Sequence, residues 1–405
     1  MFVPIEPRPA PVPTKGPVVW LKKNLFSSPF NTVLTIVTGA VVAFSLYNLA
    51  WFVFFDASWG QVWANMKLFA VYRYPADLLW RPLAIAAGLM FLLGGMAGVG
   101  GRGSITANTF FALQGFVAVL SVVAVVFWPS VRFLWPMVLV AGYAGYLLGR
   151  SWPRLAKLLP WAWAVWFVLG IMLLSGVTPG SGLLRVVPSR DWGGFLLTLV
   201  LFTGIIPSFP LGVALALGRN SKLPAIKYFC IAFIEIVRGA PLIMWLFIAS
   251  LLLPLLLNTD ANSLPAILRA YVAITLFSAA YMAENVRGGL QAVPRGQSEA
   301  ARALGLSAWQ TTMLIVLPQA LRAVIPAIVG QAIGLFKDTS LVFIVGLVDF
   351  FRAGDLVTVQ PQSLLVTGGV KLEVYLFVAV IYFFFAYRMS VASRQLERQL
   401  GVGVR

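Results

Sequence analysis

Residues 287–310 read RGGLQAVPRGQSEAARALGLSAWQ, and this polar stretch lies between two apolar runs, each long enough to cross a membrane. The whole chain has 405 residues, of which 60% are hydrophobic and only 11% are charged, with a mean hydropathy of +0.90. A soluble chain is about half apolar and about a quarter charged. The sequence therefore predicts an all-α polytopic membrane protein in which a structured polar loop joins two spans.

The apolar runs set the number of spans. A bilayer core of about 30 Å requires roughly 20 apolar residues in a helix. By this rule we expect ten spans, at 32–55, 83–99, 109–128, 133–149, 159–177, 193–218, 239–257, 266–286, 318–336 and 373–389. With both termini in the cytoplasm, 20 of the 30 Lys and Arg residues lie in cytoplasmic segments. This is the bias that the positive-inside rule predicts, and it fixes the orientation that we expect.

Several functions are excluded by residues that the chain lacks. It has no histidine and a single cysteine, Cys230, so we expect no His-based catalysis, no metal site and no internal disulfide. The net charge of +17 belongs in loops beside a membrane rather than against nucleic acid. The dipeptide Gly-Lys of a phosphate-binding loop is missing. If the protein uses ATP, another chain must bind it.

The chain divides near residue 190. Residues 1–31 form a Pro-rich tail, expected in the cytoplasm, and 32–190 form an extension of about five spans without a chemical motif. The extension does contain small residues at spacings that let membrane helices approach closely. They are Gly94, Gly95, Gly98, Gly142, Gly145 and Gly149.

The polar loop has the local chemistry of two short helices. Ser298 can cap a helix that Glu299 leads, and Gly305 can end it with a left-handed turn. Ser307 and Gln310 match a capping box for the second helix. Such a rigid pair suits the docking of a soluble partner. The alternative is an amphipathic segment lying on the lipid surface.

The loop resembles the EAA loop of ABC-importer permease subunits, written E-A-A, three residues, G, nine residues, I, one residue, L-P. The matching residues are Glu299, Ala300, Ala301, Gly305, Ile315, Leu317 and Pro318. In that family the loop, here 291–317, forms coupling helices that sit in a groove of the ATPase subunit. The resemblance implies that Glu299 pairs with a cation of the ATPase and that Gly305 lets the helices fold together.

Three further stretches are similar to the polar amino acid branch: EIVRGAPL at 235–242, AENVRGGLQ at 283–291 and KDTSL at 337–341. The role of some of the motif residues stays open: Glu235, Arg238, Gly239, Pro241, Glu284, Arg287 and Gly288. The resemblance covers 191–390 and implies the five-helix core of type I importers, followed by a cytoplasmic tail at 391–405. The extension looks like that of the larger permease of the general L-amino acid importers.

The resemblance implies ATP-driven uptake of L-amino acids, polar or of broad range, across the bacterial inner membrane. The permease itself would not be an enzyme, and it would hold no cofactor. The implied partners are two copies of an ATPase subunit carrying ATP and Mg, a second homologous permease chain, a periplasmic amino-acid-binding protein and the lipid bilayer.

Polar residues within the spans are candidates for function because charge is costly there. From Pro318 to Val348 the chain would make a helix of roughly 46 Å, longer than one span, so it must break. Lys337, Asp338, Thr339 and Ser340 are the natural place, either as a substrate contact or gate or as a plain outer helix end. Glu235 and Arg238 are three residues apart, so we expect them to pair with each other near the cytoplasmic surface.

Three rival classes remain to be weighed. An ion-coupled secondary transporter would show repeats and intramembrane carboxylates, and we find neither a repeat nor an acidic residue near the centre of a firm span. An intramembrane enzyme lacks the residues for a metal or acid–base centre. A non-transporting scaffold subunit stays open, since a second permease chain could carry the substrate site.

Overall fold

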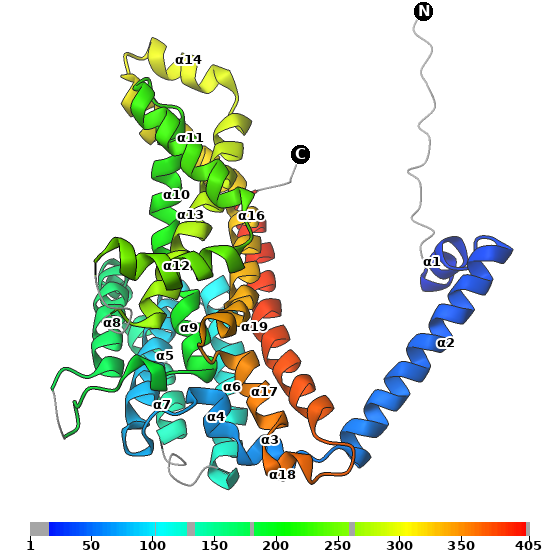
Figure 1. The fold of residues 1–405 in the computed structure, drawn as a ribbon. Coiled ribbons are helices and arrows are strands. Elements are labelled where there is room, and N and C mark those ends of the chain that lie inside the picture. Colours follow the sequence, from blue (N-terminus) through cyan, green and yellow to red (C-terminus); the bar gives the residue numbers. More distant parts are fainter. Residues whose placement is uncertain (1–15, 102, 128–133, 179–181, 259–263, 402–405) are drawn as a thin grey trace, which may run out of the picture. The chain divides into compact units, whose positions relative to one another are not determined.

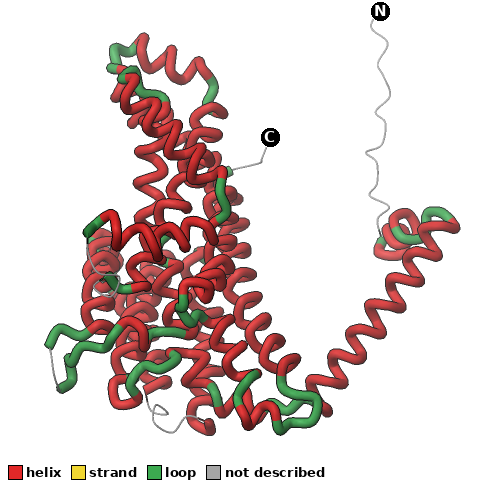
Figure 2. The backbone as a smooth tube through the Cα atoms, viewed as in Figure 1, coloured by secondary structure: helices red, strands yellow, loops and turns green. Residues whose placement is uncertain are grey.

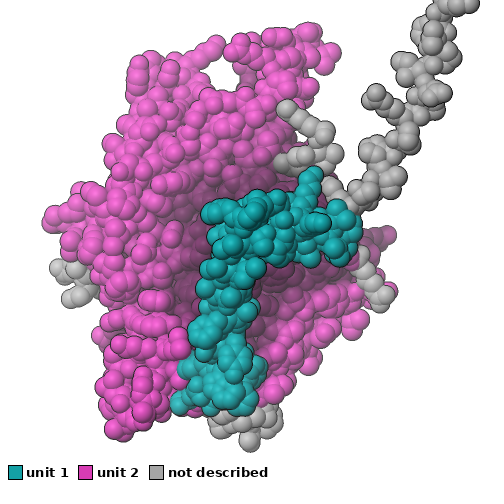
Figure 3. All heavy atoms as spheres, turned by 90° about the vertical axis from the view of Figure 1, so that its right-hand side faces the viewer, with its two compact units in different colours: residues 1–59 teal, residues 60–405 magenta. Residues whose placement is uncertain are grey.

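The computed structural model describes residues 16–101, 103–127, 134–178, 182–258 and 264–401. In these ranges the chain is helical, apart from loops and two isolated β-bridges (Figures 1 and 2). It divides into two compact units, residues 1–59 and 60–405 (Figure 3). Residues 1–15 of the predicted Pro-rich tail, and the last four residues, lie outside the described residues, and the rest of the tail contains a short helix at Pro17–Asn24.

The first unit consists of one short helix and one long apolar helix. α1 spans Pro17–Asn24, and α2 spans Pro29–Trp51 and continues as a π-helical turn through Asp56. Ser28 caps α2 by accepting a hydrogen bond from the Asn31 backbone N–H at 3.2 Å. None of the α2 residues is buried within its own unit. This is the first predicted span.

The second unit begins with six helices of the predicted extension. They are α3 (Gly60–Ala64), α4 (Met66–Val71), α5 (Trp80–Gly100), α6 (Ile105–Phe127), α7 (Leu134–Ser151) and α8 (Leu159–Ser175). The predicted close approach through glycine occurs between α5 and α7. A Cβ atom on Gly145 would lie 2.0 Å from the Phe91 carbonyl oxygen, and one on Gly149 would lie 2.2 Å from that of Gly95. The two backbones therefore touch directly.

The remaining helices form the predicted permease core. They are α9 (Gly194–Phe202), α10 (Ile205–Arg219), α11 (Pro224–Gly239), α12 (Leu242–Leu256), α13 (Ala266–Ala292), α14 (Arg295–Ala303), α15 (Ala308–Gln310), α16 (Leu317–Asp338), α17 (Phe350–Thr358), α18 (Pro361–Leu364) and α19 (Lys371–Leu400). α13 is the most buried of the long apolar helices, and it packs against α10, α11, α12 and α16. Within this unit α14 lies at the end opposite to α17 and α18 (Figure 1).

The number of spans differs from the predicted ten. In the described residues seven helices are long and apolar enough to cross a membrane, or eight if the bent pair α11–α12 counts as one. The predicted span 239–257 is one arm of that pair, whose two helices meet at 109°. α8 is a shorter apolar helix of 17 residues. Apolar length alone does not reveal a bend, and this is why the sequence placed a straight span there.

Extension and core share one packed interior. The side chain of Phe69 on α4 is 1% exposed and its ring lies 5.0 Å from Phe377 on α19 and 5.9 Å from Phe350 on α17. On α6, the ring of Phe116 stacks at 4.7 Å on Phe384 of α19. The division near residue 190 thus separates stretches with and without motifs, whereas the packing joins them.

Candidate functional site: a coupling segment and an ion-pair cluster

The polar loop folds as a helix, a left-handed turn and a second helix. α14 is followed by Gly305, whose φ is +83°, a conformation that a residue with a side chain rarely adopts. The predicted capping box is present: the Ser307 backbone N–H donates to Gln310 Oε1 at 2.9 Å, and the Gln310 backbone N–H donates to Ser307 Oγ at 3.3 Å. The expected cap at Ser298 is wrong, because α14 already begins at Arg295, after Pro294.

The surface of this segment combines one carboxylate with apolar side chains. Glu299 is exposed, and Ala301 is buried on the inner side of α14. Around them Leu304 and Trp309 are 83% and 68% exposed, and Leu314 is exposed as well. Large apolar groups on an otherwise polar helix mark an interaction surface.

The helix pair at residues 295–316, which we call the coupling segment, is continuous with a span. α15 runs without a break into a π-helical turn at Thr311–Val316 and then into α16, so that residues 308–345 form one long helical run. α14 packs against this π-helical turn. Of the motif residues, Ile315 and Leu317 are half-buried, whereas Ala300 and Pro318 are exposed. The segment is therefore joined to α16 by a helix rather than by a loop.

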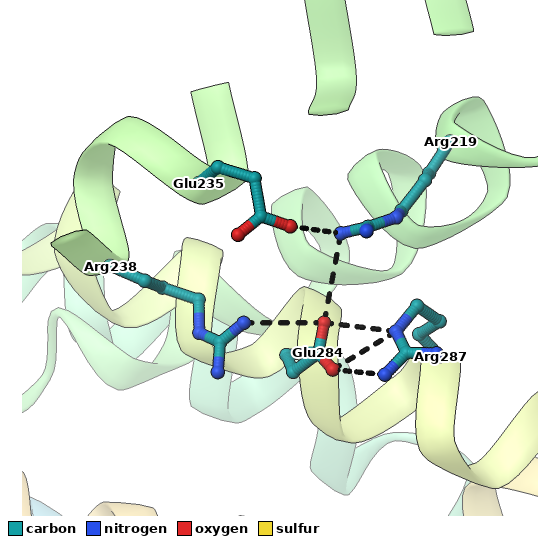
Figure 4. Close-up of polar contacts among 5 residues, drawn as sticks. All are labelled: Arg219, Glu235, Arg238, Glu284 and Arg287. Atoms are coloured by element: carbon teal, nitrogen blue, oxygen red, sulfur yellow. Dashed lines mark hydrogen bonds and ion pairs between the residues drawn. The ribbon is translucent and has the colours of Figure 1, made fainter. Parts of the chain in front are cut away.

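Five charged residues from three helices meet in what we call the Glu284 cluster (Figure 4). Arg219 ends α10, Glu235 and Arg238 lie on α11, and Glu284 and Arg287 lie on α13. Arg287 Nε donates to both carboxylate oxygens of Glu284 at 3.0 Å. Arg238 Nη1 lies 3.3 Å from Glu284 Oε2, and Arg219 Nη1 lies 2.9 Å from Glu235 Oε1 and 3.8 Å from Glu284 Oε2. Three guanidinium groups thus surround one carboxylate.

The expected pairing of Glu235 with Arg238 is wrong. Each reaches a different helix instead: Glu235 binds Arg219 of α10, and Arg238 reaches Glu284 of α13 while its guanidinium lies 5.4 Å from the ring centre of Tyr281. A spacing of three residues permits a local ion pair. The packing of α10 and α13 beside α11 provides partners that the local spacing does not show.

The other residues of the EIVRGAPL stretch build the bend. α11 ends at Gly239 and Pro241 precedes α12, where its missing N–H costs no hydrogen bond. The Trp245 indole N–H donates to the Val237 carbonyl oxygen at 3.0 Å across the bend. Gly288 faces open space, whereas a Cβ on its neighbour Gly289 would lie 2.6 Å from the Ala320 carbonyl oxygen of α16.

The KDTSL stretch lies where α16 changes its form. The α-helix ends at Asp338, and a 3-10 helix follows over Thr339–Val345. Thr339 is fully buried and donates to the Phe336 carbonyl oxygen at 2.9 Å, and Ser340 donates to that of Lys337 at 2.8 Å. Both hydroxyl groups therefore donate hydrogen bonds to the backbone. Lys337 is exposed and Asp338 half-buried, and neither has an ion-pair partner among the described residues.

One buried carboxyl group was not predicted. Asp349 caps α17 by accepting hydrogen bonds from the backbone N–H groups of Phe351 at 2.9 Å and Arg352 at 3.1 Å. Tyr382 of α19 approaches it at 3.4 Å. Its side chain is fully buried, and burial raises the pKa of Asp349 to about 6. An Asp directly before the short helix FFRAGDLVT is a usable capping signal in the sequence.

A second missed residue is Arg81, at the start of α5. Its side chain is fully buried, and its Nε and Nη2 atoms donate at 3.0 Å to the Leu183 and Arg185 carbonyl oxygens respectively. It thereby holds the segment after α8 against α5.

No group of three or more potential metal-ligating side chains occurs in the part of the chain that the structure describes.

Comparison with known proteins gives a consistent result. Residues 208–401 match the family described as the binding-protein-dependent transport system inner membrane component. The chain is 37% identical to the glutamate/glutamine/aspartate/asparagine transport system permease protein BztC of Rhodobacter capsulatus, over 98% of this chain and 96% of that protein. It is 35% identical to the inner membrane amino-acid ABC transporter permease protein YhdY of Escherichia coli, with the same coverage. A solved amino acid ABC transporter with histidines is 30% identical over 51% of this chain and 92% of that chain, with a TM-score of 0.45.

Proposed function

The chain belongs to the permeases of amino-acid ABC transporters, and from this premise we propose that it carries L-amino acids from the periplasm to the cytoplasm, driven by a separate ATPase. The observation that carries the proposal is the coupling segment, residues 295–316. Its capped helix pair presents Glu299 beside exposed Leu304 and Trp309, and its second helix is continuous with α16.

Coupling would work by mechanical transmission through this segment. Two copies of the ATPase subunit, which hold ATP and Mg, close on each other and displace α14. α13 ends three residues before α14, and α15 leads directly into α16, so both helices receive the displacement. A change of about 10⁴ in a two-state equilibrium requires about 5.5 kcal/mol of differential stabilisation. ATP-driven closure of the partner subunits would supply it.

We propose polar amino acids as the substrates. The relative from Rhodobacter capsulatus is named for glutamate, glutamine, aspartate and asparagine. A zwitterion requires a cation near its carboxylate and an acceptor near its ammonium group. Lys337 and Asp338 are adjacent, neither is held in an ion pair among the described residues, and both lie where α16 ends. They would contact the substrate or gate its path, while Thr339 and Ser340 secure the turn.

The proposed assembly has four kinds of component. A periplasmic amino-acid-binding protein delivers the substrate, and a second, homologous but different permease chain completes the pathway with this one. Both termini lie in the cytoplasm, and the spans lie in the bacterial inner membrane. The excess of Lys and Arg in the cytoplasmic segments supports this orientation.

The test is the ATPase activity of the reconstituted complex with the loaded binding protein. We expect Glu299→Ala to remove most of the substrate stimulation, because it deletes the charged contact to the ATPase, while the complex still forms. Asp56→Ala, which removes an exposed carboxylate far from this segment in the sequence, is the matched control and leaves stimulation unchanged. Full stimulation in Glu299→Ala would contradict the coupling role. Stimulated ATPase without uptake by the parent complex would favour the scaffold alternative.

A further inference from the structure

The Glu284 cluster offers two complete sets of ion pairs. Each carboxylate has one arginine on its own helix, three residues later: Arg238 follows Glu235, and Arg287 follows Glu284. In the structure one of these local pairs is formed, Glu284 with Arg287, and the other is not. Arg238 instead crosses from α11 to Glu284 on α13.

Arg219 occupies an intermediate position between the two carboxylates. Its Nη1 atom lies 2.9 Å from Glu235 and 3.8 Å from Glu284. A displacement of about an ångström would therefore move it from the first carboxylate to the second. If Glu235 turned to Arg238, Arg219 would still have an acceptor in Glu284.

This arrangement changes the cost of separating α11 from α13. The side chains of Arg238 and Glu284 are 31% and 23% exposed, so separating them costs free energy if either charge is left without a counterion. Here neither carboxylate would be left alone: Glu235 would take Arg238, and Glu284 would keep Arg287. The i, i+3 spacing lets both local pairs form within a helix. The helices can therefore part without leaving an unpaired acid.

The surroundings leave room for such a movement. An apolar cavity of about 390 Å³ opens between α11, α12 and α13, and Val237, next to Arg238, lines it together with Phe233 and Phe277. Apart from the cluster, the contact of α11 with α13 rests on a small apolar group in which Ile234 packs with Met282 and Val286. Beside this apolar contact, the charges that join α11 to α13 have alternative partners.

We propose that Arg238 and Glu284 are positioning residues of the transport cycle, forming an exchangeable ion pair that joins α11 to α13 in one state and gives way to the pairs Glu235–Arg238 and Glu284–Arg287 in the other. The proposal rests on the proposed function, because the movement would be driven through the coupling segment. Arg287 lies only eight residues before Arg295, the first residue of α14, so α13 links the cluster to that segment. At its other side Arg238 directly precedes the 109° bend.

A charge-exchange variant distinguishes this proposal from an ion pair that stays formed throughout the transport cycle. The double change Arg238→Glu with Glu284→Arg keeps an opposite-charge pair between α11 and α13. It places like charges at both i, i+3 positions, so the separated state loses both of its pairs, whereas the joined state loses the pair of residue 284 with Arg287 but keeps the one between the helices. We expect the double variant to regain part of the thermal stability that each single change loses, while stimulated ATPase stays about tenfold below the parent, equivalent to about 1.4 kcal/mol. Recovery of both thermal stability and stimulated ATPase activity would show that the ion pair stays formed throughout the cycle and would overturn the proposal.

A distance measurement decides the matter even if the charge exchange prevents folding. Spin labels at Ile236→Cys on α11 and Gln291→Cys on α13, in a Cys230→Ser background, lie at exposed positions outside the cluster. In the otherwise unchanged complex, we expect different label distances without nucleotide and with trapped ATP. One distance in both states would refute the exchange. Uptake by the parent complex is measured in parallel, and its absence would count against the proposed function instead.

Discussion

The helix pair α5–α7 and the helix group α10–α11–α13 are held together in opposite ways. In the first, glycines bring the two backbones into direct contact, so that Gly145 and Gly149 have no room for even one carbon atom. In the second, the side chains of the Glu284 cluster bridge the helices through ion pairs. Close backbone packing has one geometry, whereas ion pairs can change partners. From this comparison we expect α5 and α7 to stay together and α11 to be the helix that can move, since α10 itself packs closely on α13, where a Cβ on Gly212 would lie 2.5 Å from Met282 Cβ.

The extension and the core are closely packed where they meet. α4 places the buried ring of Phe69 among the aromatic side chains of α17 and α19. The Gly194 backbone N–H donates to the Val348 carbonyl oxygen at 2.8 Å, directly before the buried cap Asp349. A support of this kind would hold one end of the core while the coupling segment moves the other.

The largest effect is expected in the fixed pair. Gly145→Leu places a side chain where a Cβ alone would lie 2.0 Å from the Phe91 carbonyl oxygen, so α5 and α7 must move apart. We expect a loss of about 3 kcal/mol or more, within the range for overpacking of interiors, and a strongly reduced yield of folded protein in detergent. Gly115→Leu on α6, where nothing lies within 4 Å, is the control. Equal yields for the two variants would refute the fixed contact.

The next largest effect is a pH dependence of the stability, expected from Asp349 where the extension meets the core. Asp349 has a pKa of about 6, above its ordinary value of 3.8, so the native state binds this proton more tightly than the unfolded state. The contribution of Asp349 to stability is therefore greatest at low pH and falls as the pH rises from about 4 to 6, by about 3 kcal/mol in all. Thermal unfolding of the parent and of Asp349→Asn, compared from pH 4.5 to 7.5, measures this. The variant, which cannot ionise, is expected to lack this pH-dependent loss, and an identical slope in both would contradict the assignment.

A smaller effect on stability is expected in the Glu284 cluster. Glu284→Gln leaves three arginines with one carboxylate in a partly exposed site, and we expect a loss of about 1 to 2 kcal/mol in thermal or denaturant unfolding. Asp77→Asn, which breaks the more exposed pair with Arg185, should cost about 0.5 kcal/mol or less. If both changes cost the same, the cluster does not hold the helices, and the contrast with α5–α7 fails.

The smallest effect on folding is expected at the coupling turn. Gly305→Ala forces a side chain into a backbone with φ of +83°, at a cost of about 1 kcal/mol, and Gly305→Asn should cost less. Because no atom lies within 4 Å of a Cβ there, the cost is conformational only. Gly296→Ala on α14 has equal space without the strain and serves as the control. We expect stimulated ATPase activity to be lower in Gly305→Ala than in Gly305→Asn. Higher activity in Gly305→Ala would contradict the role of the turn.

The sequence predicted those features that depend on neighbours within a few residues. The Ser307–Gln310 capping box, the left-handed turn at Gly305 and the small-residue spacing of α5 and α7 all follow from local chemistry or from one helical period. The break expected at 337–340 is not found: the helical run continues to Val345 and changes from an α-helix to a 3-10 helix at Thr339.

What the sequence did not predict depends on contacts between distant segments. The spacing of Glu235 and Arg238 indicated a local pair, and only the packing of α10 and α13 shows their partners in other helices. The bend at Gly239–Pro241 was hidden within an apolar run. Arg81 and Asp349 gave no signal of burial, since nothing in their local sequence shows which helices will cover them.

The most direct test of a fixed extension beside a moving core is a paired distance measurement on one complex. Spin labels at Val119→Cys on α6 and Val140→Cys on α7 report on the extension, and labels at Ile236→Cys and Gln291→Cys report on α11 and α13; all four positions are exposed. We expect the first distance to stay the same between the nucleotide-free and ATP-bound states while the second changes. A change in the first distance with none in the second would contradict it.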